Sequence, residues 1–176
     1  MVERLRADAE AFAGCAATPG ACPSRLVAAW VAELDVLRER APMSRLAAVN
    51  RLVNMTPYRR DSATYGVRDH WASPGEFLVN GGDCEDIALF KFFLLRRLGF
   101  ADDRLRIVFV REDTPWVSHA VLAVHLDGEV YILDNLTDSV LPQGRVAGYA
   151  PLYSANETTR WAHFAPPRLI ASPDHS

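Results

Sequence analysis

Residues 80–99 constrain this chain most, because a glycine pair leads directly into a helix pattern that is apolar on most sides. Asp83 is a favoured N-cap residue, and Asp86 stands three positions later, where a capping box places an acid. Gly99 suits the left-handed position that ends a helix. We therefore expect a buried helix from Cys84 to about residue 98, whose interior is formed by Leu89, Phe90, Phe92, Phe93, Leu94 and Leu95.

The first turn of that helix carries a cysteine, Cys84. A thiol at the positive end of a helix dipole has a lowered pKa, which favours the nucleophilic thiolate. Gly81 and Gly82 leave room for a backbone to approach the sulfur closely. These features predict a reactive cysteine, although a small buried residue at a helix start is an alternative interpretation.

The order of the patterns predicts the fold class. Helix patterns cover residues 4–12, residues 24–40 with Ser24 as N-cap, and a third segment that begins at Ser44. Residues 58–72 show no clear period, so we expect an irregular segment there. Strand patterns follow at residues 105–110, 118–126 and 129–134, with shorter ones at 149–153 and 161–164. Helices followed by mainly antiparallel strands indicate an α+β fold. Without a repeat or linker, residues 1–176 are expected to form one domain.

A hairpin brings a histidine and an aspartate together. Asp127-Gly128 is a strong two-residue hairpin signal, so Leu126 should pair with Glu129 and Val121 with Asp134. His119 then shares a sheet face with Asp134 and lies diagonally across from it, within side-chain reach. The alternatives are a core histidine that finds another partner and a strand-end carboxylate that caps the next turn. Both faces of the hairpin are apolar, so we expect the sheet to be covered on both sides.

Cys84, His119 and Asp134 together match the requirements of nucleophilic catalysis. A cysteine needs a base to accept its proton, and the base needs a third group that fixes its tautomer. The order of cysteine on a helix, then histidine and aspartate on a sheet, is the papain-like or transglutaminase-like arrangement. A zinc site is disfavoured because Cys84 and His119 have no second closely spaced cysteine or histidine pair.

These motifs resemble the bacterial transglutaminase-like cysteine proteinases, from about residue 30 to residue 161. The resemblance rests on the Asp69-His70-Trp71-Ala72-Ser73-Pro74 segment, the Gly82-Asp83-Cys84-Glu85-Asp86 block with Lys91 on the same helix, Leu105-Arg106, the strand His119-Ala120-Val121-Leu122-Ala123-Val124, and Leu133-Asp134-Asn135. It implies a papain-like fold and a cysteine protease with Cys84 as nucleophile, His119 as base and Asp134 as its orienting carboxylate. Two positions depart from the family pattern: Ile87 replaces an aromatic residue and His70 replaces a tyrosine.

The resemblance also implies partners and a metal. The family includes a periplasmic protease that cuts large biofilm adhesins from the cell surface, between two small residues, under a membrane receptor that responds to cyclic diguanylate. For this chain it implies a protein substrate, a periplasmic location and Ca²⁺ bound by Asp83, Glu85 and Asp86. Carboxylate oxygens suit Ca²⁺, although capping explains Asp83 and Asp86 equally well.

Composition excludes some classes of partner. The net charge is −3 and no basic block stands out, which argues against nucleic-acid binding. No apolar run reaches the ~18 residues of a membrane span, so direct membrane insertion is not expected. The first ten residues lack an apolar signal region, so either the protein is cytoplasmic or a targeting segment has been removed.

Residues 1–23 form an N-terminal extension with two further cysteines. Cys15 and Cys22 lie seven residues apart in a turn-rich segment and predict a short-range disulfide, with two reduced thiols as the alternative. Cys84 is then the odd, free thiol.

Two other functions remain open from the residues alone. Transglutaminase or amidase chemistry would use the same three residues and differ only in the acceptor. A catalytically silent binding module would keep the fold and leave Cys84 inert.

Overall fold

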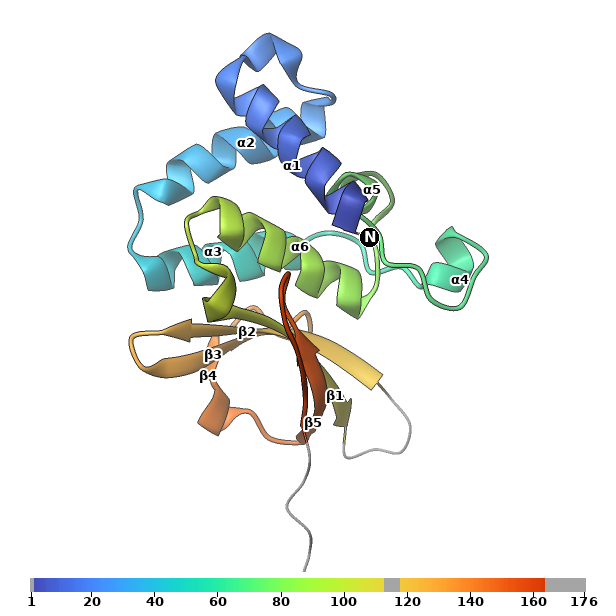
Figure 1. The fold of residues 1–176 in the computed structure, drawn as a ribbon, viewed down its shortest axis with the longest axis vertical. Coiled ribbons are helices and arrows are strands. Elements are labelled where there is room, and N and C mark those ends of the chain that lie inside the picture. The colour runs from blue at the N-terminus through green and yellow to red at the C-terminus, as the bar shows by residue number, and fades with distance from the viewer. Residues whose placement is uncertain (1, 113–117, 164–176) are drawn as a thin grey trace, which may run out of the picture.

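Six α-helices precede a six-stranded sheet in the computed structural model, which describes residues 2–112 and 118–163 (Figure 1). The helices are α1 Val2–Ala17, α2 Arg25–Arg38, α3 Pro42–Asn54, α4 Asp61–Thr64, α5 Pro74–Asn80 and α6 Cys84–Arg97. The strands are β1 Leu105–Glu112, β2 Ser118–Leu126, β3 Glu129–Leu133, β4 Leu141–Pro142, β5 Tyr149–Ala155 and β6 Arg160–Ala162. Short 3-10 turns lie at Pro19–Ala21, Asp102–Arg104 and Gln143–Arg145.

The sheet is antiparallel throughout, in the order β4-β3-β2-β1-β5-β6. The predicted hairpin is confirmed: Leu126 pairs with Glu129 and Ala123 with Ile132. Asp127 and Gly128 both have positive φ, as the tight two-residue turn requires. The expected α+β class, with helices followed by a mainly antiparallel sheet, is therefore correct.

Helix α6 is the centre of the helical layer. It packs on β1 and β2 and lies beside α3, while α1 and α2 form an outer pair (Figure 1). Its interior residues are almost entirely buried, including Phe90, Leu94 and Leu95. Because α6 is enclosed by both layers, the position of its first residue, Cys84, is fixed by the core.

The opposite face of the sheet is covered by a chain segment rather than by helices. Val110, Val121, Ala123 and Ile132 form a second, smaller cluster, against which Val146 and Tyr149 pack. Both faces are thus covered, as the apolar pattern predicted.

Several boundaries differ from the predictions. Helix α3 begins at Pro42, with Ala41 as N-cap, so the prediction that it begins at Ser44 is wrong. Proline fits the first helical position because its missing N–H has no intrahelical role there. Helix α1 is longer than expected, and α4 interrupts the segment that was expected to be irregular. Strand β6 ends at Ala162, and residue 164 of the predicted strand lies outside the described residues.

Cys15 and Cys22 form the predicted disulfide, which joins the end of α1 to the segment before α2. Cys84 is the free cysteine. Within the described residues, no helix is both long and apolar enough to cross a membrane.

Candidate active site

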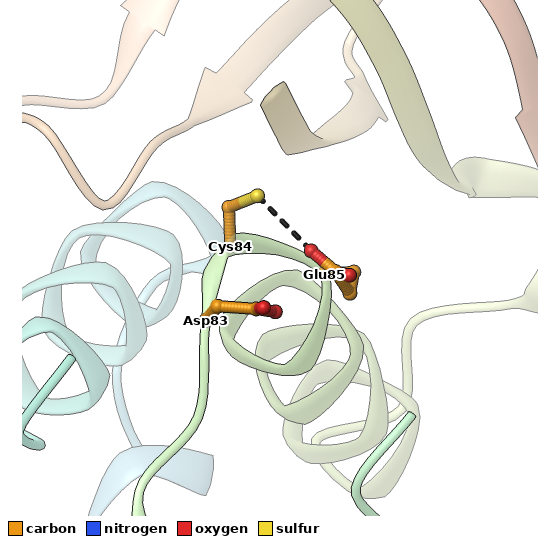
Figure 2. A group of neighbouring side chains, drawn as sticks. All are labelled: Asp83, Cys84 and Glu85. Atoms are coloured by element: carbon orange, nitrogen blue, oxygen red, sulfur yellow. Dashed lines mark hydrogen bonds between the residues drawn. The ribbon is translucent and has the colours of Figure 1, made fainter. Parts of the chain in front are cut away.

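The start of α6 carries three consecutive polar side chains, those of Asp83, Cys84 and Glu85 (Figure 2). Asp83 occupies the N-cap position, and Asp86 accepts a hydrogen bond from the Asp83 backbone N–H at 3.3 Å, so the predicted capping acid is in place. Cys84 is partly buried, and its Sγ donates a hydrogen bond to Glu85 Oε2 at 3.1 Å. The helix start therefore presents a thiol among three carboxylates.

The thiol is held in its neutral form, contrary to the expectation from the helix dipole. Burial, the charge of Glu85 and its hydrogen bond all raise the pKa of Cys84, and Asp83 adds to the effect. The Ala120 backbone N–H hydrogen-bonds the sulfur and acts in the opposite direction. Burial and the adjacent carboxylates together outweigh the partial positive charge at the end of one helix.

The glycine pair makes room for different groups from those predicted. A Cβ on Gly82 would lie 2.4 Å from Asp86 Oδ2, and one on Gly81 would lie 2.4 Å from the Pro57 carbonyl oxygen. Gly82 also pairs with Tyr58 and accepts from the Arg59 N–H at 2.9 Å. The space admits Asp86 and the backbone at residues 57–59, rather than a backbone beside the sulfur.

His119 and Asp134 are directly hydrogen-bonded, as the hairpin register predicted. His119 Nε2 lies 2.8 Å from Asp134 Oδ1, and both side chains are almost fully buried. Asp134 also accepts from the Leu136 N–H at 3.0 Å and from Tyr149 Oη at 2.6 Å. Although burial alone would raise it, these hydrogen bonds lower the pKa of Asp134 to about 2, His119 contributing most. Asp134 is therefore an ionised partner that orients the imidazole.

Strand β2 links the thiol to this pair. The backbone N–H of Ala120, the residue that follows His119, lies close enough to the Cys84 sulfur to lower the pKa of the thiol. Because His119 uses Nε2 for Asp134, Nδ1 is its other nitrogen and the one suited to accept a proton. In the described residues the thiol itself hydrogen-bonds to Glu85 rather than to the imidazole.

The acidic cluster is larger than the sequence predicted. Ligand atoms of Asp61, Asp69 and Glu85 lie within 4.8 Å of one another, and so do those of Asp61, Asp83 and Asp86. Asp69 begins the Asp-His-Trp segment, which was a signal for it, whereas nothing in the local sequence marks Asp61.

The electrostatics of this cluster suit a cation. Asp61 and Asp83 each have a buried Oδ1 with no hydrogen-bond partner among the described residues. Burial, Glu85 and the other carboxylates raise the pKa of Asp83, and burial, opposed by two backbone N–H groups, raises that of Asp86 to about 7. Unpaired carboxylate oxygens that repel one another match the oxygen ligands that Ca²⁺ takes.

Aromatic side chains surround the thiol and the acids. Tyr58 is 54% exposed, and partial burial beside Cys84 and Asp83 raises its pKa. Tyr153, 48% exposed, stacks on Phe109 at 4.4 Å between ring centroids, and Phe109 contacts Trp71 at 5.6 Å. Trp71 is partly buried and packs against the main hydrophobic core.

Two other polar residues, Asn80 and His125, belong to neither the imidazole–carboxylate pair nor the acidic cluster. Asn80 Nδ2 donates a hydrogen bond to Tyr65 Oη at 3.4 Å. His125, near the hairpin tip, is partly buried, and burial with neighbouring arginines lowers its pKa.

The chain is similar to known proteins in sequence and structure. The family model described as bacterial transglutaminase-like cysteine proteinase BTLCP matches residues 11–168. The calcium-bound structure of Legionella pneumophila LapG is 32% identical over 84% of both chains, with a TM-score of 0.71. The EGTA-treated LapG structure is 33% identical over 80% of this chain and 77% of LapG, with a TM-score of 0.72. No curated protein sequence matches this chain significantly.

Proposed function

Because the chain belongs to the bacterial transglutaminase-like cysteine proteinase family, we propose that it is an endopeptidase with Cys84 as nucleophile, His119 as base and Asp134 as the orienting carboxylate. The observation that carries this proposal is the buried His119–Asp134 hydrogen bond at 2.8 Å, one residue from the Ala120 N–H that contacts the Cys84 sulfur.

The reaction proceeds through a thioester. His119 Nδ1 accepts the thiol proton, and Sγ forms a bond to the carbonyl carbon of the scissile amide. The Cys84 backbone N–H, which has no partner within its own helix because it lies in the first turn, is one donor to the resulting oxyanion. The imidazolium then gives its proton to the departing amine as the C–N bond breaks.

Hydrolysis of the thioester repeats the same proton transfers. His119 removes a proton from water, whose oxygen attacks the thioester carbonyl, and the thiolate leaves and recovers its proton. Asp134 remains ionised throughout, because its hydrogen bonds lower its pKa to about 2. It holds the imidazole orientation and stabilises the imidazolium.

Calcium fits the acidic cluster beside the thiol. Asp83, Glu85 and Asp86 are the ligands that the family resemblance implies, and the cluster adds Asp61 and Asp69. Bound Ca²⁺ would supply positive charge at the position where carboxylates now disfavour the thiolate, and it would draw on the Glu85 oxygen that holds the thiol. The calcium-bound LapG structure supports a calcium site in this family.

The likeness to LapG also suggests a substrate, a cellular compartment and a regulatory partner. The substrate would be a large surface adhesin, cleaved in the periplasm, and an inner-membrane receptor controlled by cyclic diguanylate would sequester the enzyme. The Cys15–Cys22 disulfide supports an oxidising compartment such as the periplasm.

Alkylation of Cys84 tests the catalytic assignment. In calcium-loaded protein at pH 7, iodoacetamide should react with Cys84 at least tenfold faster in the wild type than in His119→Ala, and Cys84→Ser should show no label. Equal, slow labelling of both proteins would refute the triad and favour the silent binding module.

A second assay separates hydrolysis from acyl transfer to an amine. Adhesin fragments are incubated with the enzyme and a labelled primary amine, and the products are identified by mass spectrometry. New free carboxyl termini support the protease, whereas incorporation of the amine would support transglutaminase chemistry.

A further inference from the structure

Lys91 is a completely buried lysine that the proposed mechanism does not use. It lies on α6, seven residues after Cys84, and therefore about two turns further along the same helix. None of its surface is exposed, and its Nζ donates a hydrogen bond to Asn50 Oδ1 at 2.7 Å. Asn50, on α3, is also completely buried.

Asn50 also hydrogen-bonds to the turn that follows β3. Its Nδ2 donates to the Thr137 carbonyl oxygen at 2.9 Å. One turn further along α3, Asn54 Nδ2 contacts the carbonyl oxygens of Asp134 and Thr137 at 3.0 and 3.1 Å. The chain of contacts therefore runs from the helix of Cys84, through α3, to the turn of Asp134.

Burying the Lys91 amino group disfavours its charged form and therefore lowers the stability of the fold. Burial lowers the pKa of Lys91 to about 7, and only the charges of Asp134 and Asp138 oppose that effect. Replacing buried ionic groups by apolar residues of similar volume often leaves the stability of a protein unchanged or increases it. A lysine here is therefore better explained by the geometry that its hydrogen bond fixes than by stabilisation.

We infer that Lys91 and Asn50 are positioning residues, which fix the turn carrying Asp134 relative to the helix carrying Cys84. Cys84 and Asp134 lie on separate elements, so the thiol and the imidazole–carboxylate pair meet correctly only if these elements keep one relative position. The inference rests on the proposed function, because it assigns a role in that reaction.

The test removes both hydrogen-bonding partners together. Lys91→Met with Asn50→Leu replaces the polar pair by apolar side chains of similar size, which leaves no orphaned polar atom between them. The control is Leu95→Ala, an apolar truncation at a completely buried position one turn further along α6. It should lower the melting temperature without changing kcat per folded molecule.

The double variant should keep its melting temperature and lose activity. We expect kcat to fall about 10- to 100-fold with KM changed less than about twofold, since small displacements of reacting groups have effects of this size. Hydrogen exchange at residues 134–138 should accelerate at least tenfold, and Cys84 alkylation should slow towards the His119→Ala rate.

Each result bears on a separate statement. Unchanged kcat and unchanged exchange at residues 134–138 would overturn the positioning role, as would a lower melting temperature with normal kcat. If wild-type alkylation does not depend on His119, the protease proposal fails instead. Exchange at residues 134–138 then still decides whether Lys91 and Asn50 fix the turn.

Discussion

Tyr149 Oη donates a hydrogen bond to Asp134 Oδ2 at 2.6 Å, while the other carboxylate oxygen of Asp134 bonds to His119. The tyrosine ring also lies against the imidazole, with 5.6 Å between the ring centroids. Tyr149 comes from β5, on the opposite side of β1 from β2. The imidazole and its carboxylate are thus held by a strand that the sequence does not place beside them.

Tyr149→Phe removes this hydrogen bond and keeps the ring. A hydrogen bond to a charged group contributes about 1.5–3 kcal/mol, so the free energy of unfolding should fall by about that amount. Because the carboxylate loses one of its two side-chain partners, we expect kcat to fall about 3- to 10-fold. Urea unfolding and steady-state kinetics measure the two effects, and a variant equal to wild type in both would show that Tyr149 does not hold Asp134.

Acid should destabilise the wild type through Asp134. The pKa of this carboxyl is lowered from 3.8 to about 2 in the folded protein, chiefly by the hydrogen bonds from His119 and Tyr149, which outweigh burial. A lowered carboxyl pKa stabilises the fold above the unfolded value and loses that contribution as the pH falls towards the folded value. The contribution is about 2 kcal/mol, so it should disappear between about pH 4 and pH 2.

The comparison protein for this measurement is Asp134→Asn, which cannot titrate at this position. The difference in unfolding free energy between wild type and variant should shrink by about 2 kcal/mol from pH 5 to pH 2. A constant difference across that range would mean that Asp134 is not ionised in a stabilising contact.

Gly82→Ala should disturb the acidic cluster from the side of the backbone. The added Cβ would lie 2.4 Å from Asp86 Oδ2 and 2.5 Å from Asp86 Cβ, so Asp86 must move. We expect the free energy of unfolding to fall by about 1–3 kcal/mol, as at other overpacked positions. Calcium binding should also be weaker. Gly14→Ala is the control, because it lies in α1 with no atom within 4 Å of the new Cβ. It should stabilise the protein by about 0.5–1 kcal/mol.

The features that local patterns specify were predicted closely. The Asp127-Gly128 turn fixed the register of β2 and β3, and with it the contact between His119 and Asp134. The cap at Asp83 likewise fixed the start of the helix that carries Cys84. Both depend on residues that are neighbours in sequence or are paired by a two-residue loop.

Contacts between distant segments were not predicted. Asp61 joins the acidic cluster because the backbone at residues 58–59 runs beside Gly82, a pairing that no local pattern marks. The raised pKa of Cys84 was missed for a related reason, because it depends on burial and on where Glu85 points. Short strands such as β4 carry too few residues for a period to be recognised.

Replacing Asp61 by asparagine separates repulsion from metal binding in the acidic cluster. Asp61 is 2% exposed, and its Oδ1 has no hydrogen-bond partner among the described residues, although ligand atoms of Asp69, Asp83, Glu85 and Asp86 lie nearby. Without calcium, removing one of several crowded charges relieves repulsion, so Asp61→Asn should melt at a higher temperature than wild type. With calcium the order should reverse, because the ion binds the wild type more tightly and stabilises it by mass action.

The reversal is tested by measuring the melting temperatures of wild type and Asp61→Asn in a chelator and in calcium. A concentration of about 1 to 5 mM is on the order of the dissociation constants of extracellular calcium sites. Asp103→Asn, at an exposed position outside the cluster, is the matched loss of charge and should follow the wild type in both conditions. If calcium raises the melting temperatures of wild type and Asp61→Asn equally, Asp61 is not a ligand. If it raises neither, the cluster does not bind calcium, and the carboxylates beside Cys84 would serve only to cap the helix and hold the thiol neutral.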